Sequence, residues 1–203
     1  MYLNILSDKQ KILFPFLKHF RREFVLVGGT AIALQIGHRK SIDFDLFKQT
    51  SINKKKIKEK VYALNYPKQL IFEDSESIHY LVNDVKITFF QYPFAIKPAI
   101  DIESIIRMPD LLTLAAMKFY AMGRRAKWKD YVDIYFLLKN YFTISEVSQK
   151  ASEIFADAYS EKLFRQQIVY FEDIDYSEPV EWIDTPIEED FIKEQLIELS
   201  LKF

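Results

Sequence analysis

The feature that most constrains the fold of this chain is a short apolar run that ends in two glycines and is soon followed by a strand-like segment with two carboxylates. Val25–Val27 leads directly into Gly28 and Gly29, and the later segment, residues 42–47, has the sequence IDFDLF. Residues 31–36 lie between them and have a helix-like composition. A strand, a glycine turn, a short helix and a second strand in this order predict the start of an α/β core.

The two carboxylates, Asp43 and Asp45, stand at positions i and i+2 of the second predicted strand. Because successive side chains of a strand point to opposite faces, we expect Ile42, Phe44 and Leu46 to face a core. Both aspartates then lie side by side on the other face. Two like charges this close repel each other, and a divalent cation removes the repulsion. Hard oxygen ligands suit Mg²⁺, which binds one or two carboxylates together with substrate phosphates.

Gly28, Gly29 and Thr30 supply the second half of the predicted site. Glycines lack Cβ atoms, so main-chain N–H groups can approach an anion closely at the N-terminus of the next helix, where phosphate is favoured. The Thr30 hydroxyl is a further candidate ligand. A triphosphate held here beside a metal on Asp43 and Asp45 is the arrangement that nucleotidyl transfer requires. Taken singly, the glycines also fit a plain turn and the aspartates a solvated strand face; their combination favours the site.

These residues also carry a resemblance to a known family. The pattern GG-T-x-x-x-L followed by R-x-S-x-D-x-D-L-F resembles the minimal nucleotidyltransferase fold, in particular the AbiEii/AbiGii toxin family of bacterial toxin–antitoxin and abortive-infection systems. In this chain the pattern comprises Gly28, Gly29, Thr30, Leu34, Arg39, Ser41, Asp43, Asp45, Leu46 and Phe47. Residues 110–118, the K-D-x-x-D segment 129–133, and Val169-Tyr170-Phe171 with Trp182 are similar to the same family.

The resemblance implies both a fold and a reaction. The fold would be α/β (α+β), a nucleotidyltransferase core with a mixed β-sheet flanked by helices, followed by a C-terminal helical half. The reaction would be Mg²⁺-dependent transfer of NMP from an NTP to an acceptor hydroxyl. By resemblance that acceptor would be the tRNA 3′ end, although protein side chains and small molecules serve other members of the wider superfamily. The protein would be the toxin of a toxin–antitoxin or phage-defence system, with an antitoxin as its partner.

The same resemblance implies residue roles. Asp43 and Asp45 would hold the metal; Gly28, Gly29, Thr30 and Ser41 would bind the triphosphate; Lys118 and Arg39 would stabilise the developing phosphate charge; and Asp130 would take part in catalysis.

One position departs from the pattern of this fold. A third acidic residue is usual on a later core strand, and the matching strand here offers Lys86 and Thr88, with no carboxylate between Asp84 and Asp101. Either two carboxylates suffice, with Asp130 or a water completing the coordination, or metal binding is weakened. Alternatively, the protein is a catalytically degenerate module that binds nucleotide, RNA or a protein partner.

Composition narrows the class of protein. With 203 residues, 49% hydrophobic and 28% charged, the chain can bury a core, and no apolar run is long enough to span a bilayer. We read no signal peptide, and the absence of cysteine fits a cytoplasmic protein. The net charge of −1 hides an asymmetry: residues 1–150 hold 24 basic and 15 acidic residues, whereas residues 151–203 hold 4 and 14. A basic body suits a protein that handles nucleotides or nucleic acid.

The hydrophobic pattern predicts an α/β core over residues 1–105 and a helical region over residues 106–203 packed on it. Strands are expected at residues 24–27, 42–47, 69–72, 77–82 and 85–92, the last two joined by a tight Asn83-Asp84 turn. Helices are expected at residues 8–22 with a break at Pro15, and at 30–37, 53–64, 110–122, 128–139, 144–157, 161–169 and 186–201.

Lys118 lies on a predicted helix that is otherwise almost wholly apolar. A buried ammonium group without an anion is costly, so Lys118 either extends along the helix to water or contacts an anion such as the nucleotide phosphates. Downstream, Asp130 and Asp133 share one helix face. They either cap the helix and pair with Arg124 or Arg125, or orient Lys118 and the metal.

Four cations surround Trp128 between two predicted helices: Arg124, Arg125, Lys127 and Lys129. This basic run fits either a solvated turn or a contact with an RNA acceptor, in which phosphates bind the cations and a base stacks on Trp128. The lysines of residues 54–60 are interpreted as a solvated helix face. Arg39 either reaches a phosphate or forms a surface ion pair, and the three histidines share no metal-ligand spacing.

The acidic segment, residues 172–194, contains ten carboxylates and one lysine, interspersed with aromatic residues such as Trp182. Acidic linkers rarely carry such anchors, so we expect the segment to lie on a surface. It is either a structural wrap that pairs with the basic body, a competitor of nucleic acid, or a surface that a basic antitoxin recognises.

Overall fold

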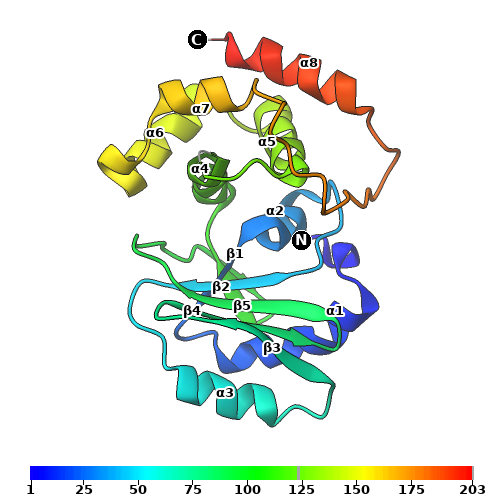
Figure 1. Cartoon of the computed structure of the whole chain (residues 1–203), viewed down its shortest axis with the longest axis vertical. Helices are drawn as coiled ribbons and strands as arrows, with labels where there is room; N and C mark the ends of the chain where they lie inside the picture. Colours follow the sequence, from blue (N-terminus) through cyan, green and yellow to red (C-terminus); the bar gives the residue numbers. More distant parts are fainter. Residues whose placement is uncertain (123, 203) are drawn as a thin grey trace. The chain divides into compact units, whose positions relative to one another are not determined.

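The computed structural model describes residues 1–122 and 124–202 and divides the chain into two compact units. The first unit comprises Met1–Ile36 and Lys40–Asp110, and the second comprises Gly37–Arg39 and Leu111–Phe203. The first is built around a β-sheet and the second consists of helices (Figure 1).

In its described residues, the first unit contains a seven-stranded sheet in the order β3-β4-β5-β2-β1-β7-β6. The strands are β1 (Val25–Val27), β2 (Phe44–Lys48), β3 (Lys68–Glu73), β4 (Ser77–Val82), β5 (Val85–Gln91), β6 (Ile100–Ile102) and β7 (Ile106–Met108). β2 runs parallel to β5 and β1 parallel to β7, whereas the other neighbours are antiparallel. The expected α/β class with a mixed sheet is therefore confirmed.

One face of the strands β2, β4 and β5 is buried. Three helical segments cover it: α1 (Asp8–Leu13), η2 (Phe14–His19) and α3 (Lys54–Tyr62) (Figure 1). The ring of Phe14 lies 6.2 Å from that of Phe44 on β2, and the ring of Phe20 lies 4.7 Å from that of Phe89 on β5. Because this aromatic layer fixes the inward face of β2 and β5, it also fixes the face on which their polar side chains emerge.

Polar residues occupy the opposite face of the sheet. Asp45 of β2 is paired in register with Thr88 of β5, and Thr88 is paired with His79 of β4. Residues paired in register project to the same face, so these three side chains form one row. Helix α2 (Gly28–Ile36) lies on this side, directly after β1 (Figure 1).

Several local predictions can be compared with this fold. Asn83 and Asp84 join β4 to β5 with φ angles of 49° and 62°, which confirms the tight turn and gives it the backbone of a type I′ hairpin. Helix α1 ends at Leu13, and Pro15 lies in the first turn of the 3₁₀ segment that begins at Phe14, as the expected break requires. The prediction for Ile42 is wrong: β2 begins only at Phe44, and Ile42 is 52% exposed instead of facing the core.

The second unit is helical. It contains α4 (Leu111–Met122), α5 (Trp128–Asn140), α6 (Ile144–Phe155), η3 (Ala156–Ala158), α7 (Glu161–Gln167) and α8 (Glu189–Ser200). Helix α4 packs against α5, α6 and α7, and α8 packs against α5. Because three helices surround α4, most of its side chains are buried, and these include Lys118. Within the described residues, no helix combines the length and apolarity needed to cross a membrane.

Candidate active site

The predicted glycines and aspartates meet at one point of the first unit. Val27 is paired in register with Asp45, so Gly28, the next residue, lies beside the Asp45 side chain. Gly28 has a φ of +74°, and a Cβ atom on it would lie 2.5 Å from Asp45 Oδ2. Two features therefore disfavour a side chain at position 28: the positive φ angle of the backbone and the close approach of the Asp45 carboxylate. This contact places the Asp45 carboxylate against the first turn of α2.

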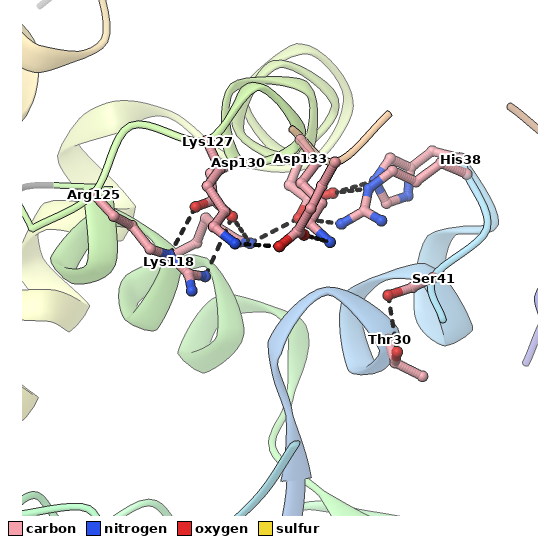
Figure 2. A network of polar contacts seen from close by, with 11 residues as sticks. Thr30, His38, Ser41, Lys118, Arg125, Lys127, Asp130 and Asp133 are labelled. Atoms are coloured by element: carbon pink, nitrogen blue, oxygen red, sulfur yellow. Dashed lines mark hydrogen bonds and ion pairs between the residues drawn. The ribbon is translucent and has the colours of Figure 1, made fainter. Parts of the chain in front are cut away.

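Thr30 makes a second link between α2 and the aspartates. Its hydroxyl hydrogen-bonds with the Ser41 hydroxyl at 2.9 Å (Figure 2). It also donates to the main-chain carbonyl of Asp43. Thr30 and Ser41 are both buried, so these hydroxyls hold the chain that leads to Asp43 in place. Sequence reasoning assigned both residues to the triphosphate, and that role stays a prediction. Their side-chain contacts link α2 to the segment that carries Asp43.

The donor set of this site suits a hard divalent cation. Asp43 and Asp45 are half-buried and carry the carboxylate oxygens that Mg²⁺ prefers. Among the described residues, no group of three or more His, Cys, Asp and Glu side chains is placed to hold a metal by itself. Two carboxylates fit a Mg²⁺ ion that completes its coordination with substrate phosphates and water.

Thr88 is the residue at which the family resemblance leads us to expect a third carboxylate. It is paired with Asp45 in the parallel ladder of β2 and β5, and it is 7% exposed. Lys86 precedes it by two residues and therefore projects to the same face. The departure seen in the sequence thus falls beside the carboxylate pair, where a neutral hydroxyl stands in place of an acid.

In the second unit, Lys118 lies between two carboxylates. Its Nζ atom is 2.6 Å from Asp130 Oδ1 and 2.8 Å from Asp133 Oδ2, and its side chain is 4% exposed (Figure 2). The interpretation in which Lys118 extends to water is therefore wrong. Asp130 also accepts a hydrogen bond from Arg125 Nε at 3.0 Å. Asp130 thus pairs with Arg125 and also orients Lys118, whereas its role toward a metal stays a prediction.

Asp133 is the centre of this group. Arg39 donates from Nε to Asp133 Oδ1 at 2.7 Å and from an Nη atom to Oδ2 at 2.9 Å, and His38 Nε2 lies 2.7 Å from Oδ1. The Arg39 side chain is 3% exposed, so the ion pair expected at the surface is instead buried. We call His38, Arg39, Lys118, Asp130 and Asp133 the buried ion cluster.

Burial and charge act against each other in the buried ion cluster. Burial alone would raise the pKa of Asp133, but Arg39 and Lys118 outweigh it and hold that pKa well below its usual range. Burial would lower the pKa of Lys118, and Asp130 and Asp133 reverse this, so that Lys118 remains charged. Burial prevails only at His38, whose pKa is lowered although Asp133 opposes the shift.

Carboxylates neutralise much of the basic run. Lys127 and Lys129 both contact the carboxylate of Glu178, and Arg125 contacts Asp130 as described above. Burial alone would raise the pKa of Glu178, but the two lysines lower it to about 2. Arg124 lies over the ring of Tyr120, 3.7 Å from its centroid.

Trp128 does not match its predicted role. It is 8% exposed, and its ring lies 6.2 Å from that of Tyr131 and 6.0 Å from that of Tyr176. The prediction that a base stacks on Trp128 is corrected accordingly, because the ring belongs to the core of the second unit. The sequence pattern of an aromatic among cations does not distinguish a core aromatic from an exposed one.

The acidic segment lies on the second unit, as its aromatic anchors predict. Asp175 N donates to Ala126 O at 2.7 Å, and Trp128 N donates to Asp175 O at 3.1 Å. Further along, the Trp182 ring lies 6.3 Å from that of Phe136. These contacts hold Glu178 beside the basic run.

Sequence reasoning gave His38 and Glu178 no individual role. The only sequence signal for His38 is its place beside Arg39, because the histidines lack metal-ligand spacing. Glu178 is one of ten carboxylates in the acidic segment, and nothing in the sequence separates it from the others.

Comparisons with known proteins agree with this fold. The family model of the nucleotidyl transferase AbiEii toxin, type IV TA system, matches residues 11–108 and 84–196. MenT4, a nucleotidyltransferase toxin from Mycobacterium tuberculosis H37Rv, is similar with a TM-score of 0.65 and 13% identity over 95% of this chain and 82% of its own. JHP933 from Helicobacter pylori is similar with a TM-score of 0.55 and 18% identity over 97% and 90% of the two chains.

A sequence relative extends the comparison. Protein aq_aa25 of Aquifex aeolicus strain VF5 is 27% identical over 156 residues, which cover 74% of this chain and 75% of that protein. At their identities the two solved structures show a shared fold alone. The family model spans most of the chain. The chain therefore belongs to the AbiEii nucleotidyl transferase toxin family of type IV toxin–antitoxin systems.

Proposed function

We propose that this protein transfers NMP from an NTP to an acceptor hydroxyl in a Mg²⁺-dependent reaction. The observation that carries the proposal is the contact between Gly28 and Asp45, in which a Cβ atom would lie 2.5 Å from the carboxylate oxygen. It brings the N-terminus of α2, which favours anions, against a carboxylate that suits a cation. A metal–triphosphate complex needs both within one site.

The roles of the first-unit residues follow from this contact. Main-chain N–H groups of Gly28 and Gly29 would bind phosphate oxygens, while Asp43 and Asp45 would hold Mg²⁺. When bound, the ion would neutralise charge that develops on the phosphates. The acceptor oxygen attacks the α-phosphorus in line and loses its proton, the bond to the β-phosphate oxygen breaks, and pyrophosphate leaves.

Lys118 and Arg39, with Asp130, remain proposed participants through the family resemblance. The short contacts to Asp130 and Asp133 keep Lys118 charged and fix the position of its ammonium group. For the acceptor we propose the 3′ end of tRNA. The family assignment as a toxin further supports an antitoxin as partner, which co-purification of the two proteins would test.

A transfer assay tests the reaction and the acceptor together. The purified protein is incubated with Mg²⁺, total tRNA and each labelled NTP in turn, with Asp45→Asn and a chelator as controls. We expect label on tRNA with at least one NTP and none in either control. Equal labelling by wild type and Asp45→Asn would contradict the proposal, as would binding of every MgNTP without any transfer.

A second candidate is a catalytically degenerate module that binds nucleotide, RNA or a protein partner. The position of Thr88 beside Asp45, where an acid is usual, favours it. Such a module would bind MgNTP without turnover, so calorimetric binding combined with the transfer assay separates the two candidates.

A further inference from the structure

A cavity of about 420 Å³ in the first unit is lined mainly by cations. Its lining residues are Lys18, His19, Arg21, Arg22, Glu23, Lys56 and Ser104, and we call it the basic cavity. They come from three segments that are distant in sequence: the end of η2 with the turn that follows, helix α3, and the turn between β6 and β7. None of them belongs to the candidate active site.

Cations outnumber carboxylates around the basic cavity. Glu23 is the single lining carboxylate, and Lys56 at 2.6 Å and Lys48 at 3.4 Å already share it. Arg21 contacts Asp101. Lys18 and Arg22 are exposed, and no carboxylate in the described part of the chain forms an ion pair with either. Because these like charges repel one another, an anion in the cavity would lower the electrostatic energy.

Two further cations hold the backbone of this cavity in place. Arg107 donates from Nε to Arg21 O at 3.0 Å and from an Nη atom to Arg22 O at 3.3 Å. Lys60 donates from Nζ to His19 O at 2.5 Å. The turn that carries the exposed cations is therefore fixed before any ligand binds, which lowers the ordering cost of binding.

We propose that the basic cavity binds phosphates of the RNA backbone. This inference rests on the proposed function, because it takes the acceptor to be RNA. Guanidinium groups match phosphate oxygens through paired N–H donors, and ammonium groups add point charge. Of the described residues that line the cavity, His19 alone carries an aromatic ring, so cations that bind phosphate outnumber groups on which a base could stack. The contact is therefore with the backbone and independent of base sequence.

The basic cavity and the candidate active site belong to the same unit and lie at opposite ends of β1. Glu23 lines the cavity and Gly28 begins α2, so five residue steps separate them, about 17 Å when fully extended. Because η2 and α3 cover the face of the sheet opposite to α2 (Figure 1), an RNA strand that is bound at the cavity would reach the Gly28–Asp45 site around the end of the sheet.

Charge reversal tests the proposal. Arg22→Glu and Lys18→Glu are compared with Lys162→Glu, which makes the same charge change at an exposed residue of the second unit. Binding of total tRNA and of oligo(U) and oligo(A) is measured by fluorescence anisotropy over a range of salt concentrations. We expect each cavity variant to raise the Kd for all three RNAs roughly tenfold at low salt and to reduce the salt slope by about one. Lys162→Glu should resemble wild type.

Three outcomes would overturn the inference. The first is equal RNA affinity for the cavity variants and the Lys162→Glu control. The second is a loss that depends on base sequence, because the cavity would then read bases. The third is that the wild-type protein binds poly-glutamate but not RNA, and that Arg22→Glu abolishes this binding. The occupant of the cavity would then be an acidic polypeptide.

The transfer assay keeps the two proposals distinguishable. If Arg22 and Lys18 govern RNA binding but no nucleotide is transferred, the proposed reaction fails and the basic cavity stands. If tRNA is labelled and both cavity variants keep the wild-type KM for tRNA, the reaction stands and the basic cavity fails. Thermal unfolding of each variant checks that the exposed substitutions leave the fold intact.

Discussion

Thr88 stands directly beside Asp45 in the parallel pairing of β5 with β2. If the missing acid limits metal affinity, Thr88→Asp should tighten Mg²⁺ binding, because a third carboxylate would then face the cation. Calorimetric titration of Mg²⁺ with a non-hydrolysable NTP measures this change. Thr88→Ser, which keeps the hydroxyl, is the matched control. Unchanged affinity in Thr88→Asp would remove the main support for the degenerate module.

Asp43→Asn and Asp45→Asn test the carboxylate pair. Each should abolish transfer, because one anionic ligand is lost, and each should leave the fold intact, because both residues are only half-buried. Without metal, each variant should be slightly more stable to heat, since repulsion between the two carboxylates is relieved. Wild-type transfer by either variant would show that the metal assignment is wrong.

The sequence predicted the strands β4 and β5 and the turn between them because the alternation of apolar residues and the Asn83-Asp84 pair are local signals. It did not predict β6 and β7. Each spans three residues, too few to show a period, and their place depends on the pairing of β7 with β1. A non-local contact of this kind leaves no pattern in a single sequence.

The candidate site was likewise predicted only in part from the sequence. Gly28 and Asp45 were identified from chemistry carried on adjacent elements, and the structure places them in contact. The partners of Lys118 could not be ranked, because two carboxylates on one helix face fit either a cap or an ion pair. Arg39, which forms the ion pair with Asp133, lies 94 residues away in sequence, so no local pattern links the two residues.

Gly28→Ala should destabilise the first unit and displace the Asp45 carboxylate. A non-glycine residue at a φ of +74° costs about 1–3 kcal/mol, and the added Cβ atom would meet Asp45 Oδ2 at 2.5 Å. Urea unfolding measures the loss, and Gly29→Ala is the control, because Gly29 lies in α2 without a positive φ. Equal stability and MgNTP affinity in both variants would contradict the contact between Gly28 and Asp45.

Lys118→Met should be strongly destabilising. It removes the shared cation of Asp130 and Asp133 and leaves buried carboxylates undercompensated, a change that typically costs about 3–5 kcal/mol. Urea unfolding gives the cost, and the transfer assay at a temperature where the variant is folded gives its activity. Lys118→Arg, which keeps the charge, should lose less stability. A folded Lys118→Met protein with full transfer activity would remove Lys118 from the proposed catalytic residues.

The buried ion cluster predicts two steps of acid destabilisation. Burial lowers the pKa of His38 from 6.5, so the unfolded chain binds the proton more readily and stability falls as pH drops below about 6.5. The pKa of Asp133 is held well below 3.8, so its contribution is present above that pH and is lost only in stronger acid. His38→Gln should flatten the slope of unfolding free energy between pH 7 and 5 and retain the acid step. An unchanged slope would contradict burial of a neutral His38.

The acidic segment allows a test of whether it is a structural wrap. Removal of the chain from Glu172 onward takes away Trp182, which contacts Phe136, and Tyr176, which contacts Trp128. It also removes α8, which packs against α5, so the test concerns the segment together with this helix. If the segment completes the core of the second unit, the truncated protein should unfold or aggregate, because apolar surface is exposed. A monomeric truncated protein with a wild-type melting temperature would show that the wrap is dispensable.

Glu178→Gln separates competition with RNA from structural support without removing the segment. Glu178 contacts both Lys127 and Lys129, so the substitution frees two cations of the basic run. If the segment competes with RNA, the variant should bind tRNA more tightly at low salt, and the difference should shrink as salt rises, because screening weakens the freed charges. The stability cost should stay near 1 kcal/mol or below, since Glu178 is partly exposed.

Asp184→Asn is the matched control for Glu178→Gln, because it removes one negative charge from the same segment at an exposed residue. Tighter tRNA binding by both variants would indicate a general charge effect, whereas a gain confined to Glu178→Gln would assign competition to its contact with Lys127 and Lys129. Unchanged RNA affinity in both would eliminate competition. The acidic segment would then be either a structural wrap, which the truncation tests, or the surface for a basic antitoxin, for which loss of co-purification in Asp184→Asn is the measurement.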